Sequence, residues 1–499
     1  MAREAESLLR RLCADYGDTP FGREAAYTLA EHLYGQRRYE DAAAFYERYF
    51  MGGQADPARR DQARLRWSRC WRLLAEGLQG AESAPRREAL LRKALSVLTL
   101  LQGDGVTAEV AAQASLETYR VLMSQGETPR AQTQLDGLIE SQAAARAYGD
   151  VLWAALYERM LNRYQRHELA AAAADGLRYE ELRVQSRLES VPWERETFLL
   201  MGDIEAARAQ WKRAAALYSR LELLPAAATP GAPDEQSLYA FCEAAFCLAR
   251  AGELDSAYAQ LRRHLEAVGA QLPRPYAYQG AMLLGDIKVQ QRAFADAQAH
   301  FEQAQRVYGQ DDTYKTNLAR CRQGEMLLLS AEETLRSKPD RPRRELAIAQ
   351  LEQASAIFAA LLDVRRDDGG AATAAGPTQD HCFDLYLRAQ YGLGGCFELA
   401  ADDPNPDVAA SARERALWCY KRICDYFIAR ARQGQALRSS RYYVKSLDSR
   451  IRLLTGTAEP PTRDVMDMVA RLYEEYAELN LEGSILARHR AEKIRRTWR

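Results

Sequence analysis

The sequence has few of the signals that mark β-strands. Valine, isoleucine and threonine are sparse over its 499 residues, and no long stretch alternates apolar with polar side chains. Alanine, leucine, arginine, glutamate and glutamine dominate instead, and these residues favour helices. The shortage of strand signals argues against a sheet-based fold and predicts a chain that is helical nearly throughout.

An excess of charge of either sign is also missing. Lys and Arg number 68 and Asp and Glu number 69, which gives a formal net charge of −1. A neutral chain has no overall attraction for nucleic acid or for an anionic membrane. Basic clusters at 341–345 and at the C-terminal end form no continuous stripe, and we interpret them as solvated helix faces. Nucleic-acid binding is therefore disfavoured.

Disulfide spacing, a secretory signal and a membrane span are missing too. The nine cysteines are odd in number and predict free thiols in a reducing compartment. The first residues, MAREAESLLRRLCADYGD, enter an amphipathic helical pattern at once, and no uninterrupted apolar run approaches the roughly 18 residues that span a bilayer. We expect a cytoplasmic protein without a transmembrane segment. A periplasmic or cell-envelope location is the alternative if an N-terminal leader is missing from the sequence.

Catalytic and ligand-binding motifs are not recognisable. The sequence has no GxxxxGK[ST] phosphate loop and no HExxH, and its six histidines show no metal-ligand spacing. His381 beside Cys382 is the one candidate for an exposed, reactive thiol, but the sequence shows no activating partner for it. Most carboxylates share helix faces with Arg or Lys, as solvated ion pairs do. We predict no catalytic residue, no cofactor and no metal, and hence no enzyme.

What the sequence does contain is helical periodicity broken at short intervals. Apolar residues recur at three- and four-residue spacing, for example at Ala26, Leu29 and Leu33. Glycines and prolines divide these stretches, for example at Gly35 and Gly126. The chain also exceeds the roughly 250–300 residues of a single compact core. These features predict an all-α fold, an α-solenoid of antiparallel helical hairpins.

One passage of the sequence repeats. Three segments align without gaps: RRYEDAAAFYERY at 37–49, AGELDSAYAQLRRH at 251–264 and QRAFADAQAHFEQA at 291–304. Each begins a predicted second hairpin helix and has a small residue followed four positions later by a bulky one. These pairs are Ala42 and Tyr46, Ala257 and Leu261, and Ala297 and Phe301, with looser equivalents in Ala131 and Leu135 and in Ala214 and Tyr218. Alanine permits close helix approach and the bulky residue fills the space beside it, so the repeat is a packing pattern.

With these alanines, and with Met201-Gly202 and Leu284-Gly285 in first helices, the sequence resembles the tetratricopeptide repeat (TPR) family. It departs from the family pattern at Glu205 and Lys288, where an aromatic is usual, which predicts irregular first helices there. The alanine spacings of 43 and 40 residues exceed the about 34 of the standard repeat. Single repeats, such as ADYGDTPFGREAAYTLAEHLY, resemble those of bacterial Tol-Pal accessory and outer-membrane assembly lipoproteins.

Three stretches interrupt the repeat and read as loops, at 337–344, 365–380 and 401–407. The middle one combines charge, glycine and small residues without an apolar period. We therefore predict a TPR-like solenoid over 1–364, a flexible linker or loop over 365–380, and C-terminal helical repeats with a cap over 381–499. The last part should contain helices near 434–455 and 462–496.

The family resemblance implies a concave groove lined by first helices, in which a protein or peptide partner binds. The groove positions of the family correspond here to Tyr27, Glu31, Tyr34, Arg120, Asp203, Tyr239, Phe246, Met282, Asp286 and Gln290. We therefore expect a non-catalytic scaffold for protein–protein interaction. Two alternatives are an α/α-framework enzyme or ligand-binding domain with a pocket near 365–380, and a cell-envelope assembly scaffold that lacks its leader.

Overall fold

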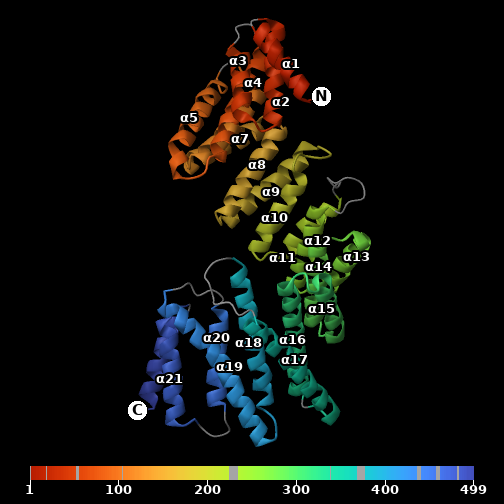
Figure 1. Ribbon diagram of the computed structural model, residues 1–499, viewed down its shortest axis with the longest axis vertical. Helices are drawn as coiled ribbons and strands as arrows, with labels where there is room; N and C mark the ends of the chain where they lie inside the picture. Colours follow the sequence, from red (N-terminus) through yellow and green to blue (C-terminus); the bar gives the residue numbers. More distant parts are fainter. Residues whose placement is uncertain are drawn as a thin grey trace. The chain divides into compact units, whose positions relative to one another are not determined.

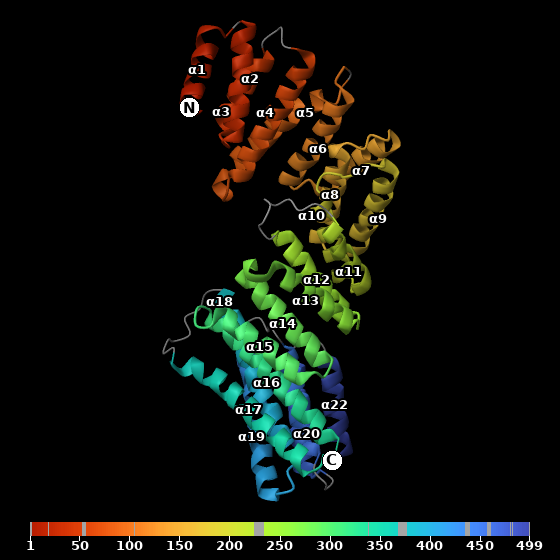
Figure 2. The ribbon, with the colours of Figure 1, turned by 90° about the vertical axis from the view of Figure 1, so that its right-hand side faces the viewer.

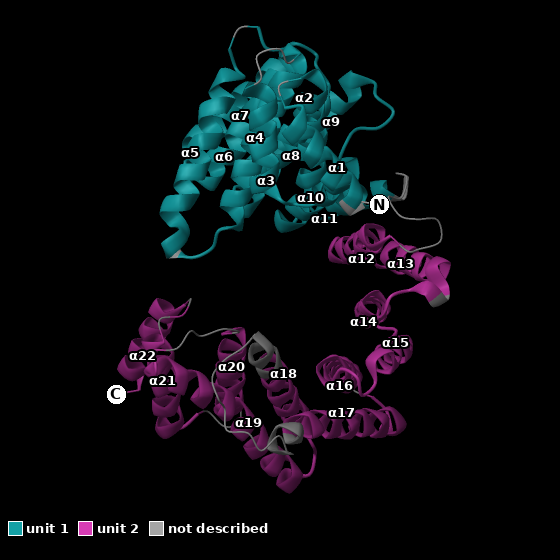
Figure 3. Cartoon of the chain, turned by 45° about the horizontal axis from the view of Figure 1, so that its top comes forward, with its two compact units in different colours: residues 1–224 teal, residues 225–499 magenta. Residues whose placement is uncertain are grey.

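The computed structural model describes residues 2–17, 19–51, 56–103, 105–223, 234–337, 339–367, 377–434, 440–456, 461–479, 481 and 483–498. These residues form twenty-two α-helices, three short 3-10 turns and no strand. The chain divides into two compact units, Met1–Leu224 and Pro225–Arg499, which Figure 3 colours teal and magenta. The all-α fold predicted from the sequence is confirmed.

The first unit consists of eleven helices, joined by short connections. They are α1 (Ala2–Asp15), α2 (Pro20–Gly35), α3 (Tyr39–Met51), α4 (Pro57–Gly77), α5 (Ala84–Leu100), α6 (Ala108–Ser124), α7 (Thr128–Ala144), α8 (Asp150–Gln165), α9 (Leu169–Ser186), α10 (Glu194–Ala207) and α11 (Trp211–Ser219). Each even-numbered helix packs against the next odd-numbered one as an antiparallel hairpin, and α1 packs on α2 (Figure 1).

The second unit has the same architecture. Its helices are α12 (Glu235–Arg250), α13 (Leu254–Val268), α14 (Arg274–Gln290), α15 (Phe294–Tyr308), α16 (Thr313–Arg336), α17 (Arg341–Asp367), α18 (Pro377–Ala400), α19 (Pro406–Arg432), α20 (Arg441–Thr455), α21 (Arg463–Glu478) and α22 (Ser484–Thr497). Consecutive helices again pack as hairpins (Figure 2). Helices α16 to α19 are longer than those of the first hairpins, and the alanine spacings of 43 and 40 residues lie before them, over α11 to α15.

The packing pattern read from the sequence is confirmed in all five hairpins. Each of the five alanines is fully buried, and each bulky residue that follows is at most 1% exposed. The partner of the bulky side chain is a small residue on the first helix. A Cβ added to Gly202 would lie 2.5 Å from a ring carbon of Tyr218, and one added to Gly285 would lie 2.6 Å from a ring carbon of Phe301. Glycine is therefore required where the ring of the second helix meets the first.

The turn inside the hairpin also repeats. The residue five positions before the buried alanine adopts a left-handed backbone in six hairpins, with φ between 57° and 84°. These residues are Arg37, Gly126, His167, Ala209, Gly252 and Arg292, with φ of 63°, 78°, 60°, 57°, 84° and 63°. The turn closes with two backbone hydrogen bonds, as in Gly252 N–H to Ala249 O at 3.1 Å and Glu253 N–H to Leu248 O at 2.9 Å. This is the Schellman ending of a helix, which favours glycine.

The left-handed position of this turn is glycine in one hairpin and alanine in another, so exchanging the two residue types should change stability in opposite directions. Because a Cβ is strained in the left-handed region, we expect Gly252→Ala to lower the free energy of unfolding by about 1 kcal/mol and Ala209→Gly to raise it by up to about 1 kcal/mol. Nothing lies within 4 Å of a Cβ at Gly252, so contacts do not confound the comparison. Thermal unfolding of the two variants measures both effects, and a shift in the same direction for both would contradict the turn assignment.

The turn reveals a hairpin that the sequence pattern misses. Helices α8 and α9 share the left-handed residue His167 and the buried Ala172, but the position four residues later is Gly176 rather than a bulky residue. A Cβ at Gly176 would lie 3.3 Å from the side chain of Met201 on α10. The space beside Ala172 is therefore filled from the next hairpin.

Several boundaries differ from the sequence predictions. The predicted helix over 462–496 is two helices, because Gly483 adopts φ +90° between α21 and α22. The predicted loop at 337–344 is shorter, since α17 begins at Arg341. The first helices α10 and α14 are continuous despite Glu205 and Lys288; Glu205 pairs with Arg208 at 2.9 Å, and Lys288 lies over the Tyr258 ring at 3.9 Å.

The predicted linker 365–380 is only partly described. Helix α17 ends at Asp367 and α18 begins at Pro377, and the residues between them lie outside the described part of the chain. The two helices pack against one another and share the core around Phe358. The proposed boundary between 1–364 and 381–499 stays a prediction.

One described helix, α17 over Arg341–Leu362, is long and apolar enough to cross a membrane, with a mean hydropathy of 1.3 in its 18-residue window. A search for uninterrupted apolar runs passes over it because Glu345 and Glu352 interrupt the run. Its side chains Ala347, Leu351 and Phe358 pack in the core formed with α16 and α18. Only 22% of the window is buried, so one face of α17 packs in this core and much of the window is exposed.

Candidate binding groove

The first helices of successive hairpins form one layer in the first unit. Helix α4 packs beside α6, α6 beside α8, and α8 beside α10. Among the described residues the second helices of neighbouring hairpins do not pack this closely. In a stack of hairpins the more tightly packed layer is the inner, concave one. The first helices therefore form the layer on which the family resemblance places the groove, and the binding of a partner there stays a prediction.

A hollow of about 470 Å³ opens on this layer between α4, α6 and α8. Its lining mixes charged, amide and apolar side chains: Arg72, Glu76, Tyr119, Arg120, Met123, Ser124, Glu158, Leu161, Asn162 and Gln165. Of the residues predicted for the groove, only Arg120 lines this hollow.

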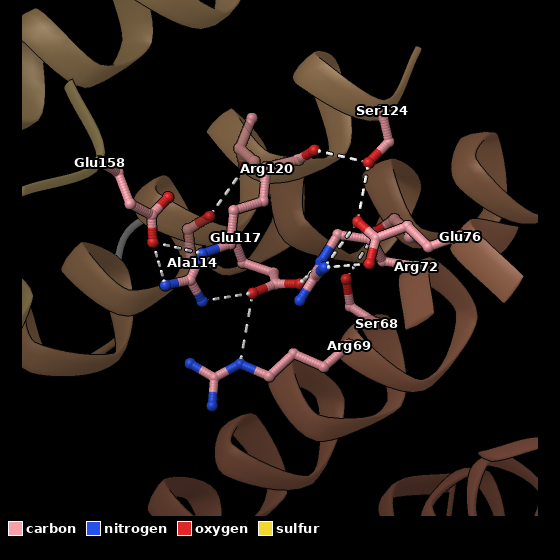
Figure 4. A network of polar contacts seen from close by, with 11 residues as sticks. Ser68, Arg69, Arg72, Glu76, Ala114, Glu117, Arg120, Ser124 and Glu158 are labelled. Carbon is pink, nitrogen blue, oxygen red and sulfur yellow. Dashed lines mark hydrogen bonds and ion pairs between the residues drawn. The ribbon is translucent and has the colours of Figure 1, made fainter. Parts of the chain in front are cut away.

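A buried charge network holds the wall of the hollow (Figure 4). The Glu117 side chain is fully buried, and its carboxylate accepts a hydrogen bond from Arg72 Nε at 2.5 Å. It lies 3.4 Å from both Arg69 Nε and Arg120 Nη1. Arg120 continues the network to α8, donating from Nε to Glu158 at 2.9 Å. Three arginines from α4 and α6 thus meet at one carboxylate, and Arg120 continues the network to α8.

Glu76 also lines the hollow, at its α4 wall. Arg72 donates to both Glu76 oxygens, at 2.8 and 2.9 Å, and the Ser124 hydroxyl donates to Glu76 at 2.9 Å. Arg72 therefore bridges two carboxylates, one buried and one at the surface. Each guanidinium in the hollow is fixed by at least two partners, which orients it before any ligand arrives.

The network shifts the pKa of its members. Burial alone would raise the pKa of Glu117, but the surrounding Arg72, Arg69 and Arg120 outweigh it and hold the pKa below its ordinary value. Burial lowers the pKa of Arg69, opposed by Glu117 and assisted by the like charges of Arg66 and Arg120. The site therefore contains an ionised, buried carboxylate and a guanidinium in a positive environment.

The residues predicted for the groove in the first unit lie on first helices, but most have partners within the fold. Glu31 accepts a hydrogen bond from Tyr46 at 2.7 Å, and Asp203 accepts one from Tyr218 at 2.6 Å, so both tie a first helix to its second. Tyr27 packs on Tyr49, with ring centroids 5.1 Å apart.

Tyr34 lies at the same end of the groove as Glu31. Its ring is 5.6 Å from that of Tyr39, and the guanidinium carbon of Arg66 lies 5.2 Å from the Tyr34 centroid. These contacts leave the ring half-buried rather than fully open. Arg120 is thus the one predicted residue that lines the hollow. Tyr27 and Tyr34 instead pack against side chains of α3 and α4.

In the second unit the predicted residues fall into two groups. Tyr239 and Phe246 on α12 remain 36% and 41% exposed, and Gln290 on α14 is exposed. Met282 is partly buried against the core, and Asp286 pairs with Arg322 on α16 at 2.5 Å. All five residues lie on two neighbouring first helices, since α12 packs beside α14.

The ion pair between Asp286 and Arg322 belongs to a second network of charges. Arg322 also pairs with Glu325 at 2.8 Å, and Glu325 accepts two hydrogen bonds from Arg388 on α18, at 3.0 and 2.7 Å. Burial raises the pKa of Asp286 despite Arg322, whereas the two arginines outweigh burial and lower the pKa of Glu325. Both units therefore link successive first helices through carboxylates and arginines, with Glu117 fully buried in the first unit and Asp286 and Glu325 partly exposed in the second.

Sequence reasoning missed most of the network in the first unit, namely Arg66, Arg69, Arg72, Glu117 and Glu158. These residues were interpreted with all other charges as solvated ion pairs. A signal existed in α4, where Arg66, Arg69 and Arg72 alternate with Trp67 and Trp71 at helical spacing. Arginines interleaved with two tryptophans, which are on average well buried, are candidates for partly buried ion pairs.

Metal and thiol chemistry find no support in the part of the chain that the structure describes. No group of three or more His, Cys, Asp or Glu side chains there could hold a metal ion. The eight described cysteines are free and buried, and burial raises the pKa of Cys242 and of Cys321 to about 12. The side chains of His381 and Cys382, and the pocket suggested near 365–380, lie outside the described residues.

No family model and no curated protein matches the chain. Among solved structures, the apo form of RapI has a TM-score of 0.39 at 12% identity, covering 79% of this chain and 99% of that one. Yeast Tom70 has a TM-score of 0.31 at 10% identity, covering 86% and 95%, and the human IFIT1 dimer with m7Gppp-AAAA has 0.30 at 12%, covering 99% and 95%. At these scores the likenesses carry no functional argument, so the TPR-like fold assignment depends on the hairpins themselves.

Proposed function

We propose that the chain is a non-catalytic scaffold that binds a protein partner through an extended segment lying on the first helices of the first unit. The observation that supports this most is the hollow between α4, α6 and α8, whose charged walls are fixed by the network around Glu117. A fixed wall loses little conformational entropy when a partner binds.

The lining suits a peptide better than an apolar small molecule. Asn162 and Gln165 on α8 offer amide groups, which can both donate to and accept from a peptide backbone. Tyr119, Met123 and Leu161 add apolar contact area to the same hollow. Polar groups that fix orientation together with apolar area are the usual composition of a protein-binding surface.

Selection from a displayed library of random dodecapeptides against the full chain tests the proposal. We expect the selected peptides to slow hydrogen exchange in α6 and α8, and we expect the double variant Asn162→Ala and Gln165→Ala to bind them at least about tenfold more weakly, or about 1.4 kcal/mol. Gln134→Ala is the matched control, because Gln134 lines a separate hollow between α5, α6 and α7. No selected sequence, or equal weakening by the control, would contradict a groove on the first helices.

A further inference from the structure

Two arginines of α4 lie next to the hollow without the partners that the other arginines have. Arg66, Arg69 and Arg72 follow one another at three-residue spacing, so they share one face of the helix. Arg72 is paired with two carboxylates. Arg66 and Arg69 continue the same face toward α2, where Tyr34 lies under the Arg66 guanidinium.

Neither of these arginines donates a hydrogen bond to any residue that the structure describes. Arg69 meets Glu117 only through Nε, at 3.4 Å, and Arg66 meets Glu31 only through Nε, at 3.6 Å. The terminal nitrogens of Arg69 point away from Glu117 (Figure 4). Each guanidinium therefore keeps two terminal nitrogens, with four N–H donors, uncommitted.

Both side chains are partly buried, and both Nε atoms are buried without a hydrogen-bond partner among the described residues. The Arg69 side chain is 19% exposed and the Arg66 side chain is 29% exposed. A guanidinium that is mostly desolvated and not fully hydrogen-bonded is costly, and an anion that accepts from its terminal nitrogens relieves that cost. Burial and the like charges of Arg66 and Arg120 lower the pKa of Arg69 despite Glu117, whereas Glu31 and nearby tyrosines outweigh burial and raise the pKa of Arg66.

The surrounding charges select the kind of anion. Glu31 lies on the α2 side of the pair, and Glu76 and Glu158 lie on the other side, at the hollow. A nucleic-acid backbone, with a phosphate at every nucleotide, would meet these carboxylates, whereas a single anionic side chain would not.

We propose that the terminal nitrogens of Arg66 and Arg69 bind the carboxylate of an internal Asp or Glu side chain in the partner segment. This inference depends on the proposed function, since it names the chemistry that the groove recognises. A guanidinium can donate two parallel hydrogen bonds to one carboxylate. Such a pair adds affinity and also fixes the register of the bound segment.

The test uses the selected dodecapeptides, synthesised with acetylated and amidated ends and titrated against the full chain. We expect an Asp or Glu at one fixed position of the selected sequences. The double variant Arg66→Gln and Arg69→Gln should weaken binding at least tenfold, and changing that peptide residue to Asn or Gln should weaken binding similarly in the unchanged protein and little in the variant. Arg92→Gln on α5 is the matched control, because its side chain is 67% exposed. Hydrogen exchange of α4 verifies that the double variant is folded.

Several results would overturn the inference while leaving the proposed function intact. Selected peptides without a fixed acidic residue, or with unchanged affinity for the double variant, would show that the pair does not read a carboxylate. If only peptides with a free C-terminal carboxylate bound, the pair would recognise the end of a chain and not an Asp or Glu side chain. A uridine oligonucleotide whose binding the double variant abolishes would instead contradict the inference and the proposed function together, because the ligand would be nucleic acid.

Discussion

Replacement of Glu117 by glutamine is expected to lower the free energy of unfolding of the first unit by about 3–5 kcal/mol, the usual cost of removing one partner of a buried ion pair. The carboxylate is fully buried and contacts Arg69, Arg72 and Arg120. Arg72 and Arg120 retain Glu76 and Glu158 in the variant, but Arg69 loses its only ion-pair partner among the described residues. The variant leaves three like charges close together around a neutral amide.

Hydrogen exchange measures this effect within the first unit, through the opening free energy of amides in α4 and α6. Glu88→Gln is the control, because Glu88 is 64% exposed and pairs with Arg92 on the surface of α5, where a substitution changes stability by less than about 0.5 kcal/mol. A loss below about 1 kcal/mol for Glu117→Gln would mean that the arginines relax into solvent and that the network does not stiffen the groove.

The difference in stability between the wild type and Glu117→Gln is expected to depend on pH. The pKa of Glu117 is lowered in the folded state from an ordinary value of 4.5, so its contribution to stability is present above that value and is lost as the pH falls through the folded pKa. The stabilities of the wild type and of Glu117→Gln should therefore converge in acid and differ most near neutral pH. A difference that stays constant with pH would exclude an ionised Glu117.

Phe301→Ala is expected to lower the free energy of unfolding of the second unit by about 3–5 kcal/mol. Phe301 is 1% exposed and fills the space beside Ala297, opposite Gly285. The truncation removes a buried ring and leaves a cavity that neighbouring helices cannot easily close. Denaturant unfolding with hydrogen exchange in α14 and α15 gives the size of the loss.

Gly285→Ala tests the other side of the same contact. The added Cβ would lie 2.6 Å from Phe301 Cε1, so we expect a loss of about 1–3 kcal/mol from overpacking. In the Phe301→Ala background the clash disappears, and Gly285→Ala should then be neutral or stabilising, which gives a strongly non-additive cycle. Gly137→Ala in α7 is the control, since its Cβ meets nothing within 4 Å, and it should stabilise by about 0.5–1 kcal/mol. Additive effects of Gly285→Ala and Phe301→Ala would contradict a direct ring-to-backbone contact.

Hairpins could be predicted from the sequence where their signals are local. Ala42 and Tyr46 are one helical turn apart, and Gly35 ends α2 in the chain itself, so spacing and punctuation suffice to place them. The α8–α9 hairpin is missed because its filling group, Met201, comes from another hairpin. The break between α21 and α22 is missed because Gly483 stands alone in an otherwise helical pattern.

The candidate site was predicted less well than the fold. Of ten predicted groove residues, Arg120 lines the hollow, whereas Glu31 and Asp203 hold hairpins together through Tyr46 and Tyr218. A family position tells which helix face a residue occupies, but it does not tell whether another side chain of the same fold already occupies its polar atoms.

The sequence by itself determined the all-α class, the hairpin repeat and the buried alanine pattern, because each depends on residues within one or two helical turns. Only the tertiary structure decided which charges are buried and paired. Arg72 and Glu117 are 45 residues apart, and Arg120 and Glu158 are 38 apart, so their contacts depend on how successive first helices stack. An arginine on a solvated face and one in a buried network look the same in a linear pattern, since they differ only in what packs against them.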